Sequence, residues 1–319
     1  MRTNLILAGL LTIGGTAFGA DPKLLNLVMP DVKVLAGANV VNAKISPLGQ
    51  YVVNTVQGSG VQFKALIAAT GFDPFSDVTE IVAATAADPA KPGGLVMMDG
   101  TFKVDQIVAA LQGQKVPATV QPYAGATLIT LTDPKAKVTP AVAFVGTSIA
   151  VAGDLAAVEA ALDRSSAANS LDPALAARVA SLSGNDDAWI VGNASISALL
   201  AGRTATPGGA ANMASQMLQN IQSYSVALKL SDNVDTAIEL QANTPENADA
   251  LGNVFKLVAN LGTMNATNDP QTAGLMQLLQ KLQVTTSGTA VDLALSVPEA
   301  TMEGLIKTIS SSAKTPNGN

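Results

Sequence analysis

An internal repeat is the sequence feature that most narrows the folds open to this chain. Residues 21–28, DPKLLNLV, align without gaps with residues 172–179, DPALAARV, nearly half a chain length later. In each copy the Asp can cap a helix and the Pro can take its first position, so both segments predict a short helix. An apolar strand follows each one, at residues 32–38 and 188–193. Further predicted helices follow each strand, at residues 47–56 and 63–69 in the first copy and at 196–201 and 211–221 in the second. The repeat therefore predicts two tandem halves of similar fold.

Each half continues with a smaller unit, in which strands joined by turns lead into an amphipathic helix. The four sets of strands are residues 80–85 with 95–99, 126–131 with 141–145 and 148–152, 223–230 with 234–242, and 283–286 with 290–297. In the first unit, the helix that follows has an apolar stripe made by Val104, Ile107 and Leu111. Alternating polarity in the strands leaves one face for a core and one for solvent. We predict an α+β fold of two tandem halves, each an antiparallel sheet with its helices packed on one face.

The N-terminal segment has the pattern of a secretory signal peptide. Arg2 provides a positive charge, residues 5–13 are apolar, and residues 17–19, AFG, form a small-x-small cleavage motif. Cleavage at the end of this motif makes Ala20 the first mature residue, whereas cleavage one residue later would put Phe18 where a small residue is required. An uncleaved anchor or a buried helix is the alternative interpretation. We predict export to the periplasm or the extracellular space.

The domain boundaries follow from the repeat and from local composition. Residues 164–170 are small and polar, which suits a surface connection between the halves. We predict a signal peptide at residues 1–19, a first α+β half at 20–165, a second at 171–312 and a disordered tail at 313–319.

Charge and composition exclude several classes of partner. The chain has 18 Lys and Arg against 24 Asp and Glu, a net charge of −6, and no run of basic residues. Nucleic acid and anionic membrane surfaces are therefore not expected partners. Without cysteine the chain can form no disulfide and carry no lipid-modified N-terminal cysteine. No segment beyond the signal peptide is long and apolar enough to span a membrane.

The absence of histidine removes the usual general base, the Ser-His-Asp arrangement and the commonest metal ligand. A serine with a lysine base remains, and residues 231–233, SDN, and 311–314, SSAK, match parts of the penicillin-binding pattern. Their order is inverted and Lys-Thr-Gly is missing, so we interpret Ser231 and its neighbours as turn residues between two strands.

Three carboxylate pairs could act as general acid and base or belong to an oxygen-only calcium site. They are Asp73 with Asp77, Asp186 with Asp187, and Asp232 with Asp235. Each pair lies in a predicted turn or cap, where Asp is favoured for local hydrogen bonds, and none has the alternating spacing of a calcium loop. We predict no catalytic residue, no cofactor site and no metal site. Phe72, Phe75 and Trp189 are interpreted as core residues.

Three short segments resemble a loose group of uncharacterised exported bacterial proteins. They are residues 46–50, SPLGQ, residues 71–75, GFDPF, and residues 150–154, AVAGD, followed by AVEAA at 157–161. The motifs are caps, turns and strand ends. The resemblance implies export and supports the fold, and it implies no activity.

These observations favour a non-catalytic binding or structural protein of the bacterial envelope. A duplicated scaffold creates a groove between its halves, which is a common place for a ligand, and the apolar composition suggests a hydrophobic one. The alternative is an extracytoplasmic hydrolase that uses serine or carboxylate chemistry, tested at Asp73, Asp77 or Ser231. A third class is a self-assembling surface protein.

Overall fold

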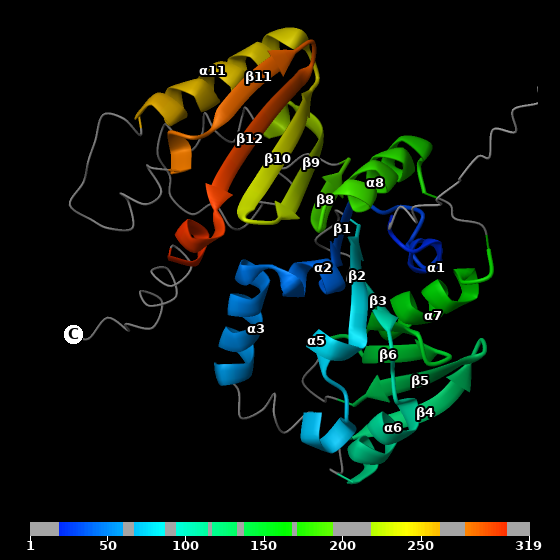
Figure 1. Ribbon diagram of the computed structural model, residues 1–319. Helices are drawn as coiled ribbons and strands as arrows, with labels where there is room; N and C mark the ends of the chain where they lie inside the picture. Colours follow the sequence, from blue (N-terminus) through cyan, green and yellow to red (C-terminus); the bar gives the residue numbers. More distant parts are fainter. Residues whose placement is uncertain are drawn as a thin grey trace, which may run out of the picture.

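The computed structural model describes residues 19–59, 67–86, 94–113, 117–132, 137–167, 171–193, 218–261 and 278–304. The strands of these residues form a twelve-stranded antiparallel sheet (Figure 1). The strands of the first half are β1 (Val34–Asn39), β2 (Val78–Thr85), β3 (Leu95–Gly100), β4 (Ala118–Tyr123), β5 (Ala126–Leu131), β6 (Pro140–Val145) and β7 (Ile149–Asp154). Those of the second half are β8 (Ala188–Gly192), β9 (Ile221–Leu230), β10 (Asn233–Ala242), β11 (Gln283–Ser287) and β12 (Ala290–Pro298).

Helices connect many of these strands. They are α1 (Pro22–Leu25), α2 (Val40–Ile45), α3 (Pro47–Ser59), α5 (Pro74–Asp77), α6 (Val104–Gly113), α7 (Leu155–Arg164), α8 (Pro173–Asn185) and α11 (Pro245–Leu261). The repeated Asp-Pro pair begins α1 and α8 as the sequence predicts. The Asp21 side chain accepts a hydrogen bond from the Lys23 N–H at 2.8 Å, and the Asp172 side chain accepts hydrogen bonds from Ala174 and Leu175.

The two halves share this sheet, and the antiparallel pair β1–β8 joins them. The strand order is β11-β12-β10-β9-β8-β1-β2-β3-β7-β6-β5-β4. Reading outward from the central pair, β1-β2-β3-β7-β6 on one side corresponds to β8-β9-β10-β12-β11 on the other. A helix follows the third strand of each series, α6 in one half and α11 in the other. This order confirms the α+β fold of two tandem similar halves.

In the first half, helices cover both faces of the sheet, which differs from the prediction of helices on one face. Neighbouring strand residues belong to different core clusters. Met97, Leu128 and Val151 pack in the cluster that includes residues of α1, α7 and α8, whereas Met98, Ile129 and Ala150 pack with residues of α6. Figure 1 shows α1, α7 and α8 on one side of β1–β3, with α2 and α3 on the other. Neighbouring residues of a strand point to opposite faces, and in these strands both sets of residues are apolar, so each face has a core. The prediction of helices on one face overlooked this.

Aromatic side chains pack closely over glycines in two strand pairs, β1–β8 and β8–β9. Gly37 of β1 lies opposite Trp189 of β8, and a Cβ at Gly37 would lie 2.4 Å from two atoms of the indole. Gly192 of β8 has the same relation to Tyr224 of β9, where a Cβ would lie 2.3 Å from the ring. A large aromatic ring therefore occupies the space over a glycine in two neighbouring strand pairs.

The predicted strands agree closely with the observed ones, and β4 was not predicted. Its sequence ATVQPY contains Pro122, and most of its side chains are exposed. Both features are typical of an edge strand. Because such a strand has no buried face, its sequence lacks the alternating apolar residues by which the other strands were predicted.

The helix predicted at residues 211–221 extends too far at its C-terminus, because Ile221 is the first residue of β9. Residues 211–217, the predicted helix at 196–201, residues 1–18 of the signal peptide and the tail at 313–319 lie outside the described residues. The predicted boundary between the halves stays a prediction.

Candidate functional site

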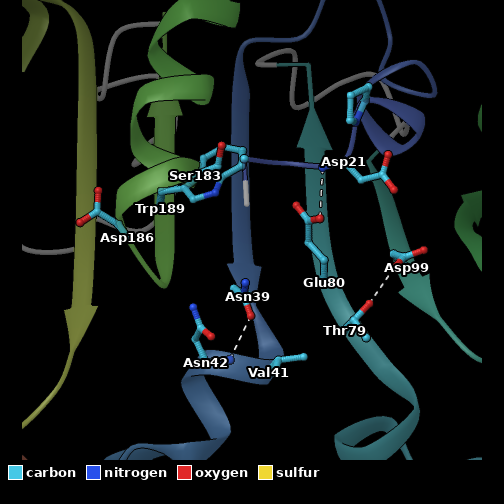
Figure 2. Close-up of a pocket in the computed structure, with 12 residues that line it drawn as sticks. Asp21, Asn39, Val41, Asn42, Thr79, Glu80, Asp99, Ser183, Asp186 and Trp189 are labelled. Atoms are coloured by element: carbon cyan, nitrogen blue, oxygen red, sulfur yellow. Dashed lines mark hydrogen bonds between the residues drawn. The ribbon is translucent and has the colours of Figure 1, made fainter. Parts of the chain in front are cut away.

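A pocket of about 600 Å³ lies where the two halves meet, at the place where the duplication predicts a groove (Figure 2). The segment before α1, the start of α2 and strands β2 and β3 line it from the first half, and α8 and β8 line it from the second. Its lining residues are Gly19, Asp21, Pro22, Asn39, Val41, Asn42, Thr79, Glu80, Asp99, Ser183, Asp186 and Trp189.

The pocket is acidic. Four of its lining residues are carboxylic acids, Asp21, Glu80, Asp99 and Asp186, and no lysine or arginine is among the described residues that line it. Low dielectric walls strengthen the field of such a set of like charges. The pocket therefore favours a positively charged group.

A row of polar side chains crosses β1, β2 and β3 at one end of these strands. The register places Asn39 of β1 opposite Glu80 of β2, and Glu80 opposite Asp99 of β3. Like charges directly opposite each other on neighbouring strands destabilise a sheet. The Thr79 hydroxyl donates a 2.7 Å hydrogen bond to Oδ2 of Asp99, which compensates for part of this cost.

Glu80 is the most perturbed acid of the pocket. The pKa of its carboxyl is raised to about 7: burial raises it most, a hydrogen bond from the Asp21 backbone lowers it, and the negative charges of Asp21 and Asp99 raise it. That bond joins the Asp21 N–H to Oε2 at 3.1 Å. Near neutral pH, Glu80 can therefore both hold and release a proton, which is unusual for a carboxyl group.

The second half contributes Asp186, Ser183 and Trp189. Burial raises the pKa of Asp186, the positive charge of Lys229 lowers it, and the charge of Asp187 raises it. The Ser183 hydroxyl donates to the carbonyl of Val179 at 2.6 Å and accepts the Ala20 N–H at 2.8 Å. Trp189 is 4% exposed and forms one wall of the pocket.

Of the three predicted carboxylate pairs, only Asp186 reaches this pocket. Its neighbour Asp187 is buried, and Oδ2 of Asp187 accepts the Leu230 N–H at 2.7 Å. The Asp187 carbonyl also accepts the Asn39 N–H at 2.8 Å. Asp187 therefore connects β1, β8 and β9 and has a structural role.

Asp73 and Asp77 form a local capping network at α5. The Asp73 side chain accepts the Phe75 N–H and the Ser76 hydroxyl, each at 3.0 Å, and Oδ2 of Asp77 accepts the Asp73 N–H at 2.8 Å. This agrees with the predicted cap. The ring of Phe72 next to the network packs on Phe102 at 5.6 Å between centroids, as a core residue.

Ser231 and Asp232 lie at the turn between β9 and β10, as predicted, whereas Asp235 lies within β10, opposite Lys229 of β9. The Ser231 hydroxyl contacts the Asn233 carbonyl at 3.4 Å, the Asp232 carbonyl accepts the Glu299 N–H at 3.2 Å, and Asp235 accepts the Ser296 hydroxyl. None of the three lines the acidic pocket.

Sequence reasoning missed Glu80 and Asp99 as a pair, although a signal was present. The two predicted strands form a hairpin in which Glu80 begins one strand and Asp99 ends the other, so antiparallel pairing opposes two acids. Ser183 gave no such signal, because its position depends on how α8 packs across the junction.

Among the residues that the structure describes, no helix is long and apolar enough to cross a bilayer. Across the same residues, no three His, Cys, Asp or Glu side chains are grouped so that they could hold a metal ion.

The fold has relatives among solved structures. No protein-family model matches the chain, and no curated protein matches its sequence. Crystal form IV of TP0453 has a TM-score of 0.54 at 10% identity, with 88% of this chain and 95% of that chain covered. Crystal form III has a TM-score of 0.53 at 9% identity, with 89% and 97% covered. At this identity, the similarity establishes that the chain shares its α+β fold with TP0453.

Proposed function

We propose that the chain is an exported, non-catalytic binding protein of the bacterial envelope, and that its ligand occupies the acidic pocket between the halves. The N-terminal segment supports export, because it has the charge, apolar stretch and cleavage motif of a signal peptide. The position of the pocket supports binding, because both halves of a duplicated scaffold contribute to it.

The ligand class follows from the lining. A purely hydrophobic ligand, which composition alone suggests, would remove water from carboxylates without giving them a partner. A small organic cation with an apolar body matches the lining better, because its charge meets Glu80 and Asp99 while its body meets Val41, Pro22 and Trp189. Indole is also the aromatic side chain that attracts organic cations most strongly.

One observation carries this proposal. Glu80 and Asp99 lie directly opposite each other in a pocket without a lysine or arginine among its described lining residues. Burial makes the ionised form of Glu80 costly, as its raised pKa reports. A bound cation would favour the ionised form and offset the repulsion between the two acids, so a cation gains electrostatic binding energy here that a neutral ligand does not gain.

Binding can be followed at the site, because Trp189 is the single tryptophan of the chain and lines the pocket. We expect putrescine, spermidine or choline to change its fluorescence saturably, and decanoic acid to have no effect. The double variant E80Q/D99N should bind the active cation at least about tenfold more weakly, which corresponds to the loss of one charge-assisted contact. D249N, which removes an exposed acid of α11 away from the pocket, should bind normally.

In a chain where a peptide bond links Ala20 to Gly19, binding should also strengthen as the pH rises from 6 to 8, because Glu80 ionises in this range. Saturable binding of decanoic acid that is unaffected by E80Q/D99N would contradict the proposed ligand class. Absence of any response to the three cations, with folding verified by circular dichroism, would contradict the site.

The second candidate is an extracytoplasmic hydrolase that uses carboxylate chemistry, and the raised pKa of Glu80 favours it. A carboxyl group that titrates near pH 7 suits a general acid, and Asp99 opposite it would supply a second carboxylate. Generic ester, peptide and glycoside substrates test this candidate. Turnover that is abolished by E80Q and by D99N, and kept by D249N, would rank it above binding.

The stability of the protein should depend on the ionisation of Glu80. In a chain where a peptide bond links Ala20 to Gly19, the folded pKa of Glu80 is about 7, above its ordinary value of 4.5. The folded state therefore holds the proton more tightly, and the stability it gains below pH 4.5 is lost as the pH rises through 7. At pH 8, E80Q should be more stable than the parent by about 1–2 kcal/mol, a value reduced for solvent screening of this half-buried group.

Urea unfolding of both chains at pH 4.5 and pH 8 measures this effect. The difference between E80Q and the parent should be small at the lower pH, where Glu80 is protonated in the folded parent and about half protonated in the unfolded parent. D249N serves as the control for removal of an acid. An equal difference at the two pH values would show that the pKa of Glu80 does not change on folding.

A further inference from the structure

The residues that follow the predicted cleavage point are held firmly in the fold. Ala20 is 8% exposed, and its N–H donates a buried 2.8 Å hydrogen bond to the Ser183 hydroxyl of the other half. The next N–H, that of Asp21, donates to Glu80. The first residues of a mature chain are often poorly ordered, so the burial of Ala20 needs an explanation.

The Ala20 nitrogen also lies close to the acids of the pocket. The Asp21 nitrogen is 3.1 Å from Oε2 of Glu80, and two successive backbone nitrogens are under 4 Å apart, so the Ala20 nitrogen is at most roughly 7 Å from this oxygen. The charged groups that act on Glu80 are Asp21 and Asp99, and Asp186 lines the pocket from the second half. All are acids, and each would gain from a cation at this position.

We propose that removal of the signal peptide creates this cation: the α-ammonium of Ala20 remains hydrogen bonded to Ser183, pairs with Glu80 and joins the two halves of the mature protein. The inference rests on the proposed export, and the ammonium meets the same Glu80 carboxyl that the proposed cationic ligand would meet. Hydrolysis of the Gly19–Ala20 bond by a signal peptidase adds a hydroxyl to the Gly19 carbonyl carbon and a hydrogen to the Ala20 nitrogen. The resulting amine takes up a proton from water at neutral pH.

The local geometry suits an ammonium group. The Ser183 hydroxyl uses its hydrogen for the Val179 carbonyl, so towards Ala20 it can only accept. An amide at Ala20 offers one hydrogen, whereas an ammonium offers three, and its full charge acts on the nearby acids of the pocket. Such a contact requires cleavage after Gly19. Cleavage one residue later would remove Ala20, and with it the hydrogen bond from the Ala20 backbone N–H to the Ser183 hydroxyl.

Four otherwise identical chains test the proposal. Two begin at Ala20 and two begin at Gly19, and one chain of each pair carries E80Q. The Gly19 chain is the control for position, because its peptide bond removes the charge from the Ala20 nitrogen and leaves the α-ammonium one residue away, at Gly19 of the pocket lining. At pH 7 the Ala20 chain should have a melting temperature roughly 2–4 °C above that of the Gly19 chain. With E80Q in both chains the difference should disappear.

A second measurement separates the charge from a simple change in length. The α-amine of Ala20, followed by NMR after selective labelling, should have a pKa above the ordinary range of about 7.7–8.0, and E80Q should return it to that range. Equal melting temperatures for the two chains together with an ordinary α-amine pKa would overturn the proposal.

The processing step is tested by the intact mass of the protein recovered after export from a bacterial host. A mature chain that begins at Ala20 supports the proposal, and any other first residue overturns it. Because the four chains above are prepared without export, and Trp189 fluorescence measures ligand binding separately, failure of this inference is distinguishable from failure of the proposed function.

Discussion

Replacing Gly37 with alanine should lower the free energy of unfolding by about 2–3 kcal/mol, which is the cost of forcing an extra carbon into a packed core. The added Cβ would lie 2.4 Å from Cε2 and Cζ2 of Trp189. The indole is buried, so it cannot move into solvent to make room. The strands concerned, β1 and β8, are the pair that joins the two halves. Strain here should therefore weaken the whole sheet.

A double-mutant cycle shows whether the indole is the cause. In a W189L background the same Gly37 change should cost under about 1 kcal/mol, because leucine leaves the space open. Urea unfolding followed by circular dichroism suits all four chains, since two of them lack tryptophan. G184A is the control, because a Cβ at Gly184 in α8 meets no atom within 4 Å, and it should be neutral or slightly stabilising. An unchanged cost in the W189L background would contradict the proposed clash.

The repeat in the sequence predicted the architecture because its signals are local. Asp21 and Asp172 cap helices through hydrogen bonds to residues two or three positions away, and alternating polarity marks each strand. The pairing of β1 with β8 is different. These strands are separated by most of the first half, and no local signal indicates that the halves share a sheet.

The candidate site was predictable only in part, for the same reason. Glu80 and Asp99 are brought together by a hairpin, whose register follows from the sequence. Ser183 and Asp186 approach them from α8 across the β1–β8 pair, and this approach depends on the packing of an entire half. Sequence reasoning instead examined acids that are close in sequence, such as Asp73 and Asp77. Proximity in sequence favours caps and turns, which is the role the structure gives this pair.

Removing the side chain of Glu299 should lower the free energy of unfolding by about 2 kcal/mol, because Glu299 connects the second half to a helix of the first. Its Oε2 accepts the Leu48 N–H at the start of α3 at 2.8 Å, and the residue is 3% exposed. A carboxylate at a helix N-terminus satisfies a free backbone donor and interacts favourably with the helix dipole. In E299A this part-buried N–H loses its acceptor, and hydrogen bonds to charged groups contribute roughly 1.5–3 kcal/mol.

The matched variant is E299Q, which keeps an oxygen for the Leu48 N–H and removes the charge. Oε1 of Glu299 is buried without a hydrogen-bond partner, so the ionised side chain also carries a desolvation cost that glutamine avoids in part. We therefore expect E299Q to lose under about 1 kcal/mol, clearly less than E299A. Hydrogen exchange at the Leu48 amide supplies the local measurement, and it should accelerate in E299A and change little in E299Q. An E299A chain with unaltered stability and unaltered exchange at Leu48 would show that this contact does not hold α3 to the second half.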